Sequence, residues 1–391
     1  MRVLHIVTAF PRSEGDVITP WLVEMLRGLK DRGIDVEVFT SSYKGLGHQV
    51  LWSIPVHRFR YFLAAWEDLT HEEMAVDRLG RSPLYKLLPV FYLIAGSLAA
   101  WRLCRQNKYQ VVHVHWPLPH ALFGWLVKKA SGAKMVSTFY GAELRWAKHS
   151  PMPFLRGFLA WAVRKSDSIV AISNYTAGEV RSIVPAPIIV IPYTIGFPHK
   201  DEGCPKRSSE KSIVLTVGRL VERKGIGYLI EAMGLLPQGL NAELLIVGGG
   251  PLRDSLEDYA RKRGLATKVK FAGRVGQEEL ISLYRKASVY VQPAVFDSRG
   301  DTEMLGVVIL EAMHYGIPVV ASNVGGISDI IRHRETGLLV PEKDPRALAD
   351  AIAEMLTNQN LRRCVVKNSS KLLSSNFNWD NILNKIIKVY K

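Results

Sequence analysis

Short apolar runs of strand length alternate with segments of helical pattern along most of the chain, and this alternation restricts the fold more than any other feature. It is typical of parallel strands that are joined by crossover helices. In the first half, strands are predicted at residues 3–7, 35–40, 111–115, 134–138, 168–172 and 188–191. In the second half, they are predicted at residues 213–217, 242–247, 269–271, 289–292, 318–321 and 337–340. The sequence therefore predicts an α/β protein with two Rossmann-like domains, which bind ligands beyond the carboxyl ends of their strands.

An irregular stretch separates the two series of strands. Pro, Gly, Lys, Asp and Ser dominate between residues 191 and 212 and prevent regular structure there. We therefore predict an N-terminal Rossmann-like domain at residues 1–197 and a C-terminal Rossmann-like domain at residues 198–375. Residues 376–391 are predicted to form an amphipathic helix. Its apolar side contains Trp379, Ile382, Leu383, Ile386 and Ile387.

Other helices are predicted from proline positions and apolar stretches. Thr19 before Pro20 predicts a capped helix start, because proline is favoured in the first turn and threonine accepts hydrogen bonds from free amides. The longest uncharged stretch, residues 87–101, is shorter than the roughly 20 residues that span a bilayer. The sequence therefore predicts no transmembrane helix. The stretch itself is either a buried core helix or an element that dips into a membrane.

The net charge of +15 is concentrated in one part of the chain. Residues 82–166 contain twelve Lys and Arg and a single acid, Glu143, and several Trp and Phe residues are interleaved with the cations. Such a segment suits anionic lipid headgroups, and we expect peripheral membrane contact there. The alternative is a solvated basic surface over an ordinary core. Nucleic acid is not an expected partner, because no base-reading motif accompanies the charge.

Cysteine usage indicates the compartment. Cys104, Cys204 and Cys364 are far apart and show no spacing that is typical of zinc, haem or disulfide frameworks. A reducing, cytoplasmic compartment fits best, with a peripheral position on the inner membrane face if the basic segment binds lipid.

Two loops of the second half combine cations and glycines at strand ends. Gly218 and Arg219 follow a strand, and Lys224 lies just before a helix, so that the two cations can bind a diphosphate. A solvated basic turn remains the alternative. The next strand ends at Gly248, where glycine lets a ligand approach the backbone and the following helix offers free N–H groups.

A pair of glutamates is the strongest single feature. Glu303 lies in a loop, and Glu311 follows eight positions later inside an otherwise apolar helix. A buried carboxylate is costly unless something donates hydrogen bonds to it. A pair of sugar or ribose hydroxyls would do so, and a structural Arg or backbone amide is the alternative.

Taken together, several motifs of the second half resemble family 4 of the retaining glycosyltransferases. They are, in chain order, Val217-Gly218-Arg219-Leu220 with Lys224-Gly225, Val247-Gly248-Gly249-Gly250-Pro251, Phe271-Ala272-Gly273, Val291-Gln292-Pro293, Glu303 with Glu311, Gly316-Ile317-Pro318-Val319-Val320-Ala321 and Gly325-Gly326. The resemblance implies the GT-B fold, in which two Rossmann-like domains face a cleft and a C-terminal helix crosses back to the first domain. It also implies a nucleotide-sugar donor.

The resemblance implies a role for each matching residue. Arg219 and Lys224 would neutralise the leaving diphosphate, and Glu303 would hold a donor-sugar hydroxyl; these three would be the catalytic residues. Glu311 would accept both ribose hydroxyls. The full set of implied donor-binding residues is Gly15, Gly218, Gly248, Gly273, Arg274, Val275, Met304, Leu305, Gly306, Val307, Val308 and Glu311.

Some positions depart from the family pattern. Tyr140 stands where the family usually has a histidine, with Glu143 as the acid that follows. Tyr140 is either a hydrogen-bond donor to a sugar on the acceptor side or a packing residue. Met304, where the family favours glycine, would narrow the sugar pocket. His113 and His115 share one strand face and His120 follows, so that either a metal pair or packing at the sheet end would explain them.

The resemblance implies transfer of a sugar from the nucleotide-sugar donor to an acceptor. The basic, aromatic segment favours a glycan or lipid-linked acceptor, that is a lipid-linked or polysaccharide-precursor acceptor at the inner membrane face. No carboxylate is placed as a nucleophile, so retention would follow a front-face route in which the leaving phosphate accepts the acceptor's proton. No acidic pair that holds a metal matches, so neither a metal nor another cofactor is expected; Asp301 beside Glu303 is the nearest candidate. A sugar-nucleotide epimerase of the same fold and a catalytically idle nucleotide- or glycan-binding subunit are the alternatives.

Overall fold

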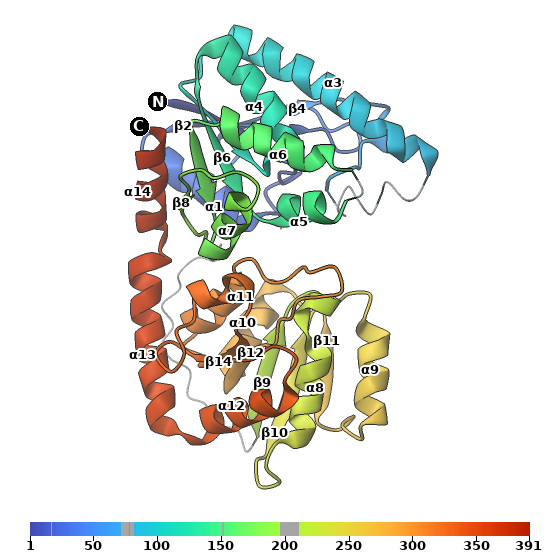
Figure 1. The fold of residues 1–391 in the computed structure, drawn as a ribbon, viewed down its shortest axis with the longest axis vertical. Helices are drawn as coiled ribbons and strands as arrows, with labels where there is room; N and C mark the ends of the chain where they lie inside the picture. The colour runs from blue at the N-terminus through green and yellow to red at the C-terminus, as the bar shows by residue number, and fades with distance from the viewer. Residues whose placement is uncertain (17, 72–77, 79–81, 151, 196–210) are drawn as a thin grey trace. The chain divides into compact units, whose positions relative to one another are not determined.

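The computed structural model describes the chain except for residues 17, 72–77, 79–81, 151 and 196–210. It divides into two compact units (Figure 1). The first unit contains Met1–Pro192 and Trp379–Lys391, and the second contains Tyr193–Asn378. The predicted domain boundary between residues 197 and 198, and Cys204, lie outside the described residues.

The first unit is built on an eight-stranded sheet with the order β3-β4-β2-β1-β5-β6-β7-β8. The strands are β1 (Arg2–Ile6), β2 (Asp35–Ser41), β3 (Gln49–Leu51), β4 (Ile54–Phe59), β5 (Val111–His115), β6 (Lys134–Phe139), β7 (Ser168–Ala171) and β8 (Ile189–Val190). All neighbouring strands are parallel except β3 and β4. Each of the six strands that the sequence predicts in this half is present.

The antiparallel β3–β4 hairpin was not predicted. Its turn is Trp52-Ser53, and both residues have positive φ, 47° and 59°. Two-residue hairpin turns of this type usually carry Asn or Gly, which adopt positive φ at little cost. Trp and Ser give no such signal, so that the turn is not recognisable from the sequence.

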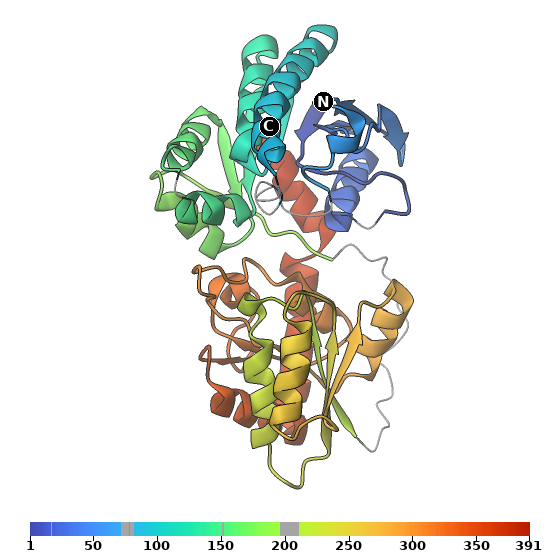
Figure 2. The same ribbon diagram turned by 90° about the vertical axis from the view of Figure 1, so that its right-hand side faces the viewer.

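Helices cover both faces of the first sheet (Figures 1 and 2). They are α1 (Pro20–Asp31), α3 (Pro83–Gln106), α4 (Pro117–Ser131), α5 (Ala142–His149), α6 (Phe154–Lys165), α7 (Asn174–Arg181) and α14 (Trp379–Tyr390), with a 3-10 turn η1 (Ala64–Trp66). Successive side chains of β1 point to opposite faces of the sheet, so each contacts a different helix layer. Val3 packs in the cluster that contains α1 and α14 residues. Leu4 packs in the cluster that contains α3 and α4 residues.

Helix α1 begins at Pro20, but the predicted cap is wrong. Thr19 has a φ of 49°, and its side chain makes no capping hydrogen bond. A capping threonine is extended at this position, which lets its oxygen reach the amides of the first turn. The left-handed backbone of Thr19 turns the side chain away from them.

The C-terminal helix returns to the first unit, as the sequence predicts. Ile382, Leu383 and Ile386 of α14 are buried in the same cluster as Leu26 of α1. The first unit therefore contains both ends of the chain.

Helix α3 is longer than the uncharged stretch, residues 87–101, on which the prediction of no transmembrane helix rests. Residues 84–106 are long and apolar enough to cross a bilayer by length and composition, and among the described residues this is the one helix of that kind. The uncharged stretch is shorter than the helix, because α3 continues through Lys86 on one side of the stretch and through Arg102 and Arg105 on the other. Core helices pass the same test, so that the packing of α3 has to decide its role.

The second unit is a six-stranded parallel sheet with the order β11-β10-β9-β12-β13-β14. Its strands are β9 (Ser212–Val217), β10 (Ala242–Val247), β11 (Val269–Gly273), β12 (Val289–Gln292), β13 (Val319–Ser322) and β14 (Leu338–Val340). Its helices are η2 (Glu222–Lys224), α8 (Ile226–Leu235), α9 (Arg253–Lys262), α10 (Gln277–Lys286), α11 (Val307–His314), η3 (Gly325–Asp329), α12 (Pro345–Thr357) and α13 (Gln359–Asn376). The strand order reverses direction between β9 and β12. In open α/β sheets, ligands bind at this switch point, beyond the carboxyl ends of the strands.

Candidate active site

Three glycine-bearing loops meet at the carboxyl ends of β9, β10 and β11. The amide of Gly218 donates to the carbonyl of Val247 over 2.9 Å, and the amide of Gly248 donates to the carbonyl of Gly273 over 2.7 Å. Gly248 has a φ of 130°, and a Cβ there would lie 2.0 Å from the carbonyl oxygen of Gly218. Only glycine fits at this contact, so the loops pack backbone against backbone.

Lys224 and Glu303 form an ion pair although 79 positions separate them in the chain. Lys224 ends the short helix after β9, and Glu303 lies in the loop that leads to α11. The two side chains are only 12% and 17% exposed, so water screens their attraction weakly. The structure therefore brings a predicted phosphate-binding cation directly against the predicted sugar-binding carboxylate.

The loop that carries Glu303 is held by a second pair of glycines. The amide of Gly326 donates to the carbonyl of Glu303 over 2.9 Å. A Cβ on Gly325 would lie 2.0 Å from the same carbonyl oxygen. The backbone on both sides of this contact is therefore fixed, and the carboxylate of Glu303 is positioned by it.

Buried polar side chains of β12 lie behind the ion pair, and sequence reasoning missed them. The hydroxyl of Tyr290 donates to Oε1 of Gln292 over 2.7 Å. Nε2 of Gln292 approaches Oε2 of Glu303 at 3.5 Å. Both side chains are buried and lie on one face of the strand, because strand residues two apart share a face. A glutamine at the end of an otherwise apolar strand was the signal that could have identified this support.

Glu311 lies on α11 and is bound by a tyrosine that was not predicted. The hydroxyl of Tyr284, on α10, donates to Oε2 of Glu311 over 2.7 Å. Burial raises the pKa of Glu311 to about 7, although the hydrogen bond from Tyr284 favours the charged form. Of the alternatives for this half-buried carboxylate, neither an arginine nor a backbone amide is its partner among the described residues.

Helix α11 begins with a free N-terminus beside these carboxylates. Its N-cap residue is Gly306, which has a φ of 93° and, as a glycine, no side chain that could accept hydrogen bonds from the first amides. The amides of Val307 and Val308 belong to the first turn, in which the N–H groups have no partner within the helix. Met304 and Leu305 are buried next to this turn. The first turn of α11 can therefore present amides and positive dipole charge to an anion.

The remaining predicted residues of this unit lie at the same strand ends. Arg219 is exposed and, within the described part of the chain, takes no part in an ion pair. Arg274 is exposed and lies against Gly249, and Val275 is half-buried. Asp301, the nearest candidate for a metal ligand, has its Oδ2 3.7 Å from Nη1 of Arg223. Asp301 is paired with Arg223 and Glu303 with Lys224, so the two carboxylates do not converge on one metal position.

The predicted residues of the first unit follow β1 and β6 of the other sheet. Gly15 is exposed in the loop after β1. The hydroxyl of Tyr140 lies 2.8 Å from Nδ1 of His115, and its ring stacks on Trp116 with centroids 4.4 Å apart. Glu143 is buried, its Oε1 accepts a hydrogen bond from the Tyr140 amide, and burial raises its pKa to about 7. Of the two interpretations of Tyr140, these contacts favour packing.

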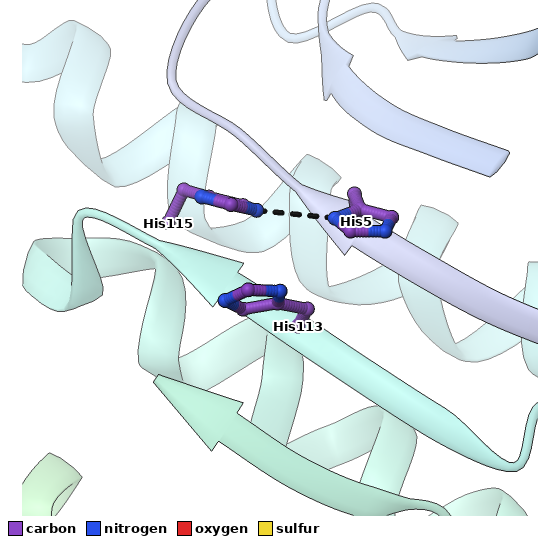
Figure 3. A group of neighbouring side chains, drawn as sticks. All are labelled: His5, His113 and His115. Carbon is purple, nitrogen blue, oxygen red and sulfur yellow. Dashed lines mark hydrogen bonds between the residues drawn. The ribbon is translucent and has the colours of Figure 1, made fainter. Parts of the chain in front are cut away.

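Three buried histidines meet behind Tyr140 (Figure 3). Nδ1 of His5 lies 3.1 Å from Nε2 of His115, and His113 stacks beneath His115 with ring centroids 4.1 Å apart. Among the described residues, this is the one group whose potential metal-ligating atoms all lie within 4.8 Å of one another.

Hydrogen bonds and ring geometry favour packing over metal binding at these histidines. Both ring nitrogens of His113 are within 2.7 Å of a hydroxyl, that of Thr138 or that of Tyr390. Stacked rings also hold their in-plane lone pairs side by side instead of converging on one ion. Burial lowers the pKa of His113 to about 3, so that the ring is neutral at pH 7. His120 binds elsewhere, to the hydroxyl of Tyr92 at 2.9 Å.

Comparisons with known proteins agree with this architecture. Residues 20–195 match the family described as Glycosyltransferase Family 4, and residues 201–372 match the one described as Glycosyl transferases group 1. A glycosyltransferase of Methanocaldococcus jannaschii, itself uncharacterized, is 30% identical over 94% of this chain and 92% of its own. The GDP-mannose-dependent alpha-(1-6)-phosphatidylinositol monomannoside mannosyltransferase of Mycobacterium tuberculosis is 28% identical over 80% of this chain and 85% of its own.

Solved structures show the same fold. Sucrose-phosphate synthase from Thermosynechococcus elongatus matches with a TM-score of 0.75 and 22% identity, over 100% of this chain and 98% of that chain. The predicted GT-B fold is thereby confirmed. With family matches in both halves and a relative along nearly its whole length, this chain belongs to the glycosyltransferases.

Proposed function

We propose that this glycosyltransferase binds a nucleotide-activated sugar at the carboxyl ends of β9 to β12 and transfers the sugar with retention of its anomeric configuration. The observation that carries the proposal is the Lys224–Glu303 ion pair, which lies at the switch point of the second sheet. It combines a cation for phosphate with a carboxylate for hydroxyls in a poorly solvated place, and the free end of α11 lies beside Glu303.

The diphosphate of the donor would bind Lys224 together with the exposed Arg219. A phosphate competes with Glu303 for the ammonium group, so binding of the donor would release the Glu303 carboxylate. That carboxylate would then accept a hydrogen bond from a hydroxyl of the sugar. The amides of Leu305, Gly306, Val307 and Val308 would complete the anion site.

The nucleoside would bind beside the diphosphate. Oε2 of Glu311 already accepts from Tyr284, and its second oxygen is the acceptor that we assign to the ribose hydroxyls. The backbone of Gly273, Arg274 and Val275 would border the base, next to Gly248. Backbone groups would form hydrogen bonds with the edge of the base, so the side chains at this site do not indicate which base is bound.

Transfer would follow the front-face route. The bond between the anomeric carbon and the diphosphate oxygen breaks with both electrons going to the phosphate, and the acceptor hydroxyl attacks from the same side. The departing phosphate takes the hydroxyl proton. Lys224 and Arg219 would stabilise the charge that grows on this phosphate, so that catalysis rests on electrostatics and positioning. Metal independence belongs to the same proposal, because Asp301 and Glu303 each face a cation of the chain.

The acceptor that we propose is lipid-linked, or a polysaccharide precursor at the inner membrane face. The basic segment 82–166 of the first unit supports it, since a lipid-linked acceptor requires an enzyme that reaches a membrane. The mycobacterial relative is named for a phosphatidylinositol mannoside, which is itself a lipid.

The experiment that tests donor binding is a thermal-shift panel with UDP, GDP, ADP and their common sugar conjugates. A ligand that binds only the folded protein raises its melting temperature with concentration. We expect one base to give a clear shift in the wild type, and Glu311→Ala to reduce that shift strongly. Glu278→Ala, which removes an exposed carboxylate at the start of α10, is the matched control and should leave the shift unchanged.

The panel decides whether a donor site exists, and an activity assay then decides between an enzyme and an idle subunit. If no nucleotide shifts the wild type, donor binding at this site is wrong. If one does, its sugar conjugates can be incubated with lipid extracts in the presence of EDTA, and the linkage can be determined by NMR. An inverted anomeric centre would refute the front-face route, and loss of activity in EDTA would refute metal independence.

A further inference from the structure

Helix α3 is apolar on two opposite faces, and only one of them packs against the protein. Leu88, Tyr92, Ala100 and Cys104 of the inner face are buried. Gly96 lies between them, and a Cβ there would meet the ring of Phe123 at 2.4 Å. The inner face is thus fitted closely to α4 along most of the helix length.

The outer face of α3 exposes a continuous apolar stripe. Its members recur every three or four residues, which places them on one side of a helix. Each is between 43% and 56% exposed, and they are Leu87, Val90, Phe91, Ile94, Leu98 and Trp101. The stripe extends sideways, since Phe62 lies with its ring 5.2 Å from that of Phe91 and the neighbouring Leu63 is exposed. Contiguous exposed apolar surface of this kind marks an interaction site.

Within the described residues, cations of α3 and α4 flank this apolar stripe, and neither helix contains an Asp or Glu. Lys86, Arg102 and Arg105 are exposed on α3 itself, and the guanidinium of Arg105 lies 4.8 Å above the ring of Trp101. Helix α4, which packs beside α3, ends in Lys128, whose ammonium lies 2.6 Å from Oδ1 of Asp167, and in the exposed Lys129. The one acid of residues 82–166, Glu143, is buried. A protein partner would have to be both apolar and acidic. An anionic bilayer offers both, because its acyl chains are apolar and its headgroups carry negative charge.

The packing of the inner face decides the orientation of the helix. A helix that spans a bilayer is surrounded by lipid or by other spanning helices. In α3, the buried hydroxyl of Tyr92 is hydrogen-bonded to Nε2 of His120, and Phe123 fills the space over Gly96. The helix therefore stays attached to the unit along its inner side, and only its outer side is available to lipid.

We infer that α3 lies in the plane of an anionic membrane, with the apolar stripe among the acyl chains and the flanking Lys and Arg at the phosphates. The inference rests on the proposed function, because it identifies the element by which an enzyme with a lipid-linked acceptor reaches the membrane. It commits to a bilayer surface as the occupant of the stripe, and a second copy of the chain is one outcome of the test.

The test is co-sedimentation of the full-length protein with vesicles. Wild type is expected to bind vesicles of phosphatidylcholine with phosphatidylglycerol and to bind pure phosphatidylcholine weakly. A triple variant, Phe91→Gln with Ile94→Gln and Leu98→Gln, should bind anionic vesicles at least about tenfold less well, because three large apolar side chains no longer enter lipid. The matched control carries Val50→Gln, Ile189→Gln and Leu235→Gln, which removes exposed apolar side chains elsewhere and should bind like wild type.

A second measurement reports insertion directly. Lipids brominated in their acyl chains should quench wild-type tryptophan fluorescence, and Trp101→Phe should remove most of that quenching. Wild-type affinity in the triple variant, or absence of quenching, would overturn the inference and leave charge alone as the attraction. If sedimentation of the free protein shows an oligomer that the triple variant dissociates while vesicle binding is unchanged, the stripe is covered by a second copy and the inference is wrong.

Failure of this inference is separable from failure of the proposed function. None of the three substituted residues belongs to the proposed donor site, so the triple variant should keep the wild-type thermal shift. A triple variant that loses vesicle binding and keeps the nucleotide shift supports both ideas. Vesicle binding without any nucleotide shift would retain the membrane helix and reject the donor site.

Discussion

Glu143 and Glu311 illustrate how burial sets the chemistry of single residues in this protein. Burial raises the pKa of each carboxyl to about 7. The two differ in their partners. Oε2 of Glu311 accepts from a tyrosine hydroxyl, whereas Oε2 of Glu143 has no hydrogen-bond partner within the part of the chain that the structure describes. Each carboxyl therefore changes charge near neutral pH, and only the one in the second unit lies where a nucleoside is proposed to bind.

The raised pKa of Glu311 predicts a pH-dependent nucleotide affinity. The ionised carboxylate accepts ribose hydroxyls best, so affinity should rise as pH increases through about 7. Tyr284→Phe removes the donor that favours the charged form, which raises the pKa of Glu311 further. We expect the midpoint of the affinity profile to move upward by about one pH unit, measured by titration calorimetry from pH 6 to 9.

Tyr259→Phe is the control for that experiment. Its hydroxyl donates to Oε2 of Glu231 over 3.0 Å, so the substitution removes the same kind of hydrogen bond away from the site. The profile should stay where it is in wild type. An unchanged profile in Tyr284→Phe would mean that Glu311 does not bind the ligand.

The same group makes a defined contribution to stability. The folded-state pKa of Glu311 lies above the 4.5 of an ordinary glutamate, so the folded protein binds more protons than the unfolded chain between about pH 4.5 and 7. Stability from this group therefore falls as pH rises through that window and is constant above it. Nucleotide binding and stability thus respond to pH in opposite directions at one carboxyl.

At the scale of elements, the site depends on how closely the strand-end loops approach one another. The β10 loop can contact the β9 loop only because Gly248 has no side chain and adopts a φ of 130°. The contact leaves no room for relaxation, since the atom in the way belongs to the backbone of Gly218.

Gly248→Ala should therefore separate these loops. We expect the free energy of unfolding to fall by about 2 kcal/mol or more, because both the clash and the backbone strain must be relieved, and the nucleotide shift to be lost. Urea unfolding followed by fluorescence and the thermal-shift panel measure the two effects. Gly227→Ala is the control: it lies in α8 with one neighbour at 3.9 Å, and it should stabilise by about 0.5–1 kcal/mol. A Gly248→Ala protein with wild-type stability would refute the steric argument.

The strands could be predicted from the sequence because parallel strands are continuous apolar runs. The hairpin of β3 and β4 could not, since its turn residues, Trp52 and Ser53, carry no turn signal. The candidate site divides in the same way. Glycines and charges at strand ends are visible in the sequence, and the resemblance groups Lys224 with Glu303. Tyr284 gives no signal in the sequence, and Gln292 appears there only as a motif position without a role, because the fold alone brings each to its partner.

At the scale of the whole molecule, the first unit is completed by the last helix of the chain. Leu383 and Ile386 of α14 belong to the cluster of buried residues that includes Val3 of β1 and Leu26 of α1. The hydroxyl of Tyr390 also reaches Nδ1 of His113, at 2.7 Å. The terminal helix is therefore part of a core and not an appendage.

Leu383→Ala should destabilise the first unit selectively. Removing a fully buried leucine side chain typically costs about 2–5 kcal/mol. Hydrogen exchange measured by mass spectrometry should show lost protection in β1 and α1 while β9 and β10 keep theirs. Ile387→Ala, at a partly buried position of the same helix, should have a clearly smaller effect. Equal loss of protection in both sheets would show that the units do not unfold independently.

This arrangement has a consequence for how the protein is made. Synthesis at about 5–20 residues per second delivers β1 first and α14 last. Residues of the second unit, Tyr193–Asn378, form one uninterrupted segment and can fold as soon as they leave the ribosome. The first unit must wait with an uncovered apolar face until α14 has been synthesised. A chain that stops before residue 379 would thus carry a finished second unit joined to an unfinished first one, whose exposed apolar surface marks it for degradation.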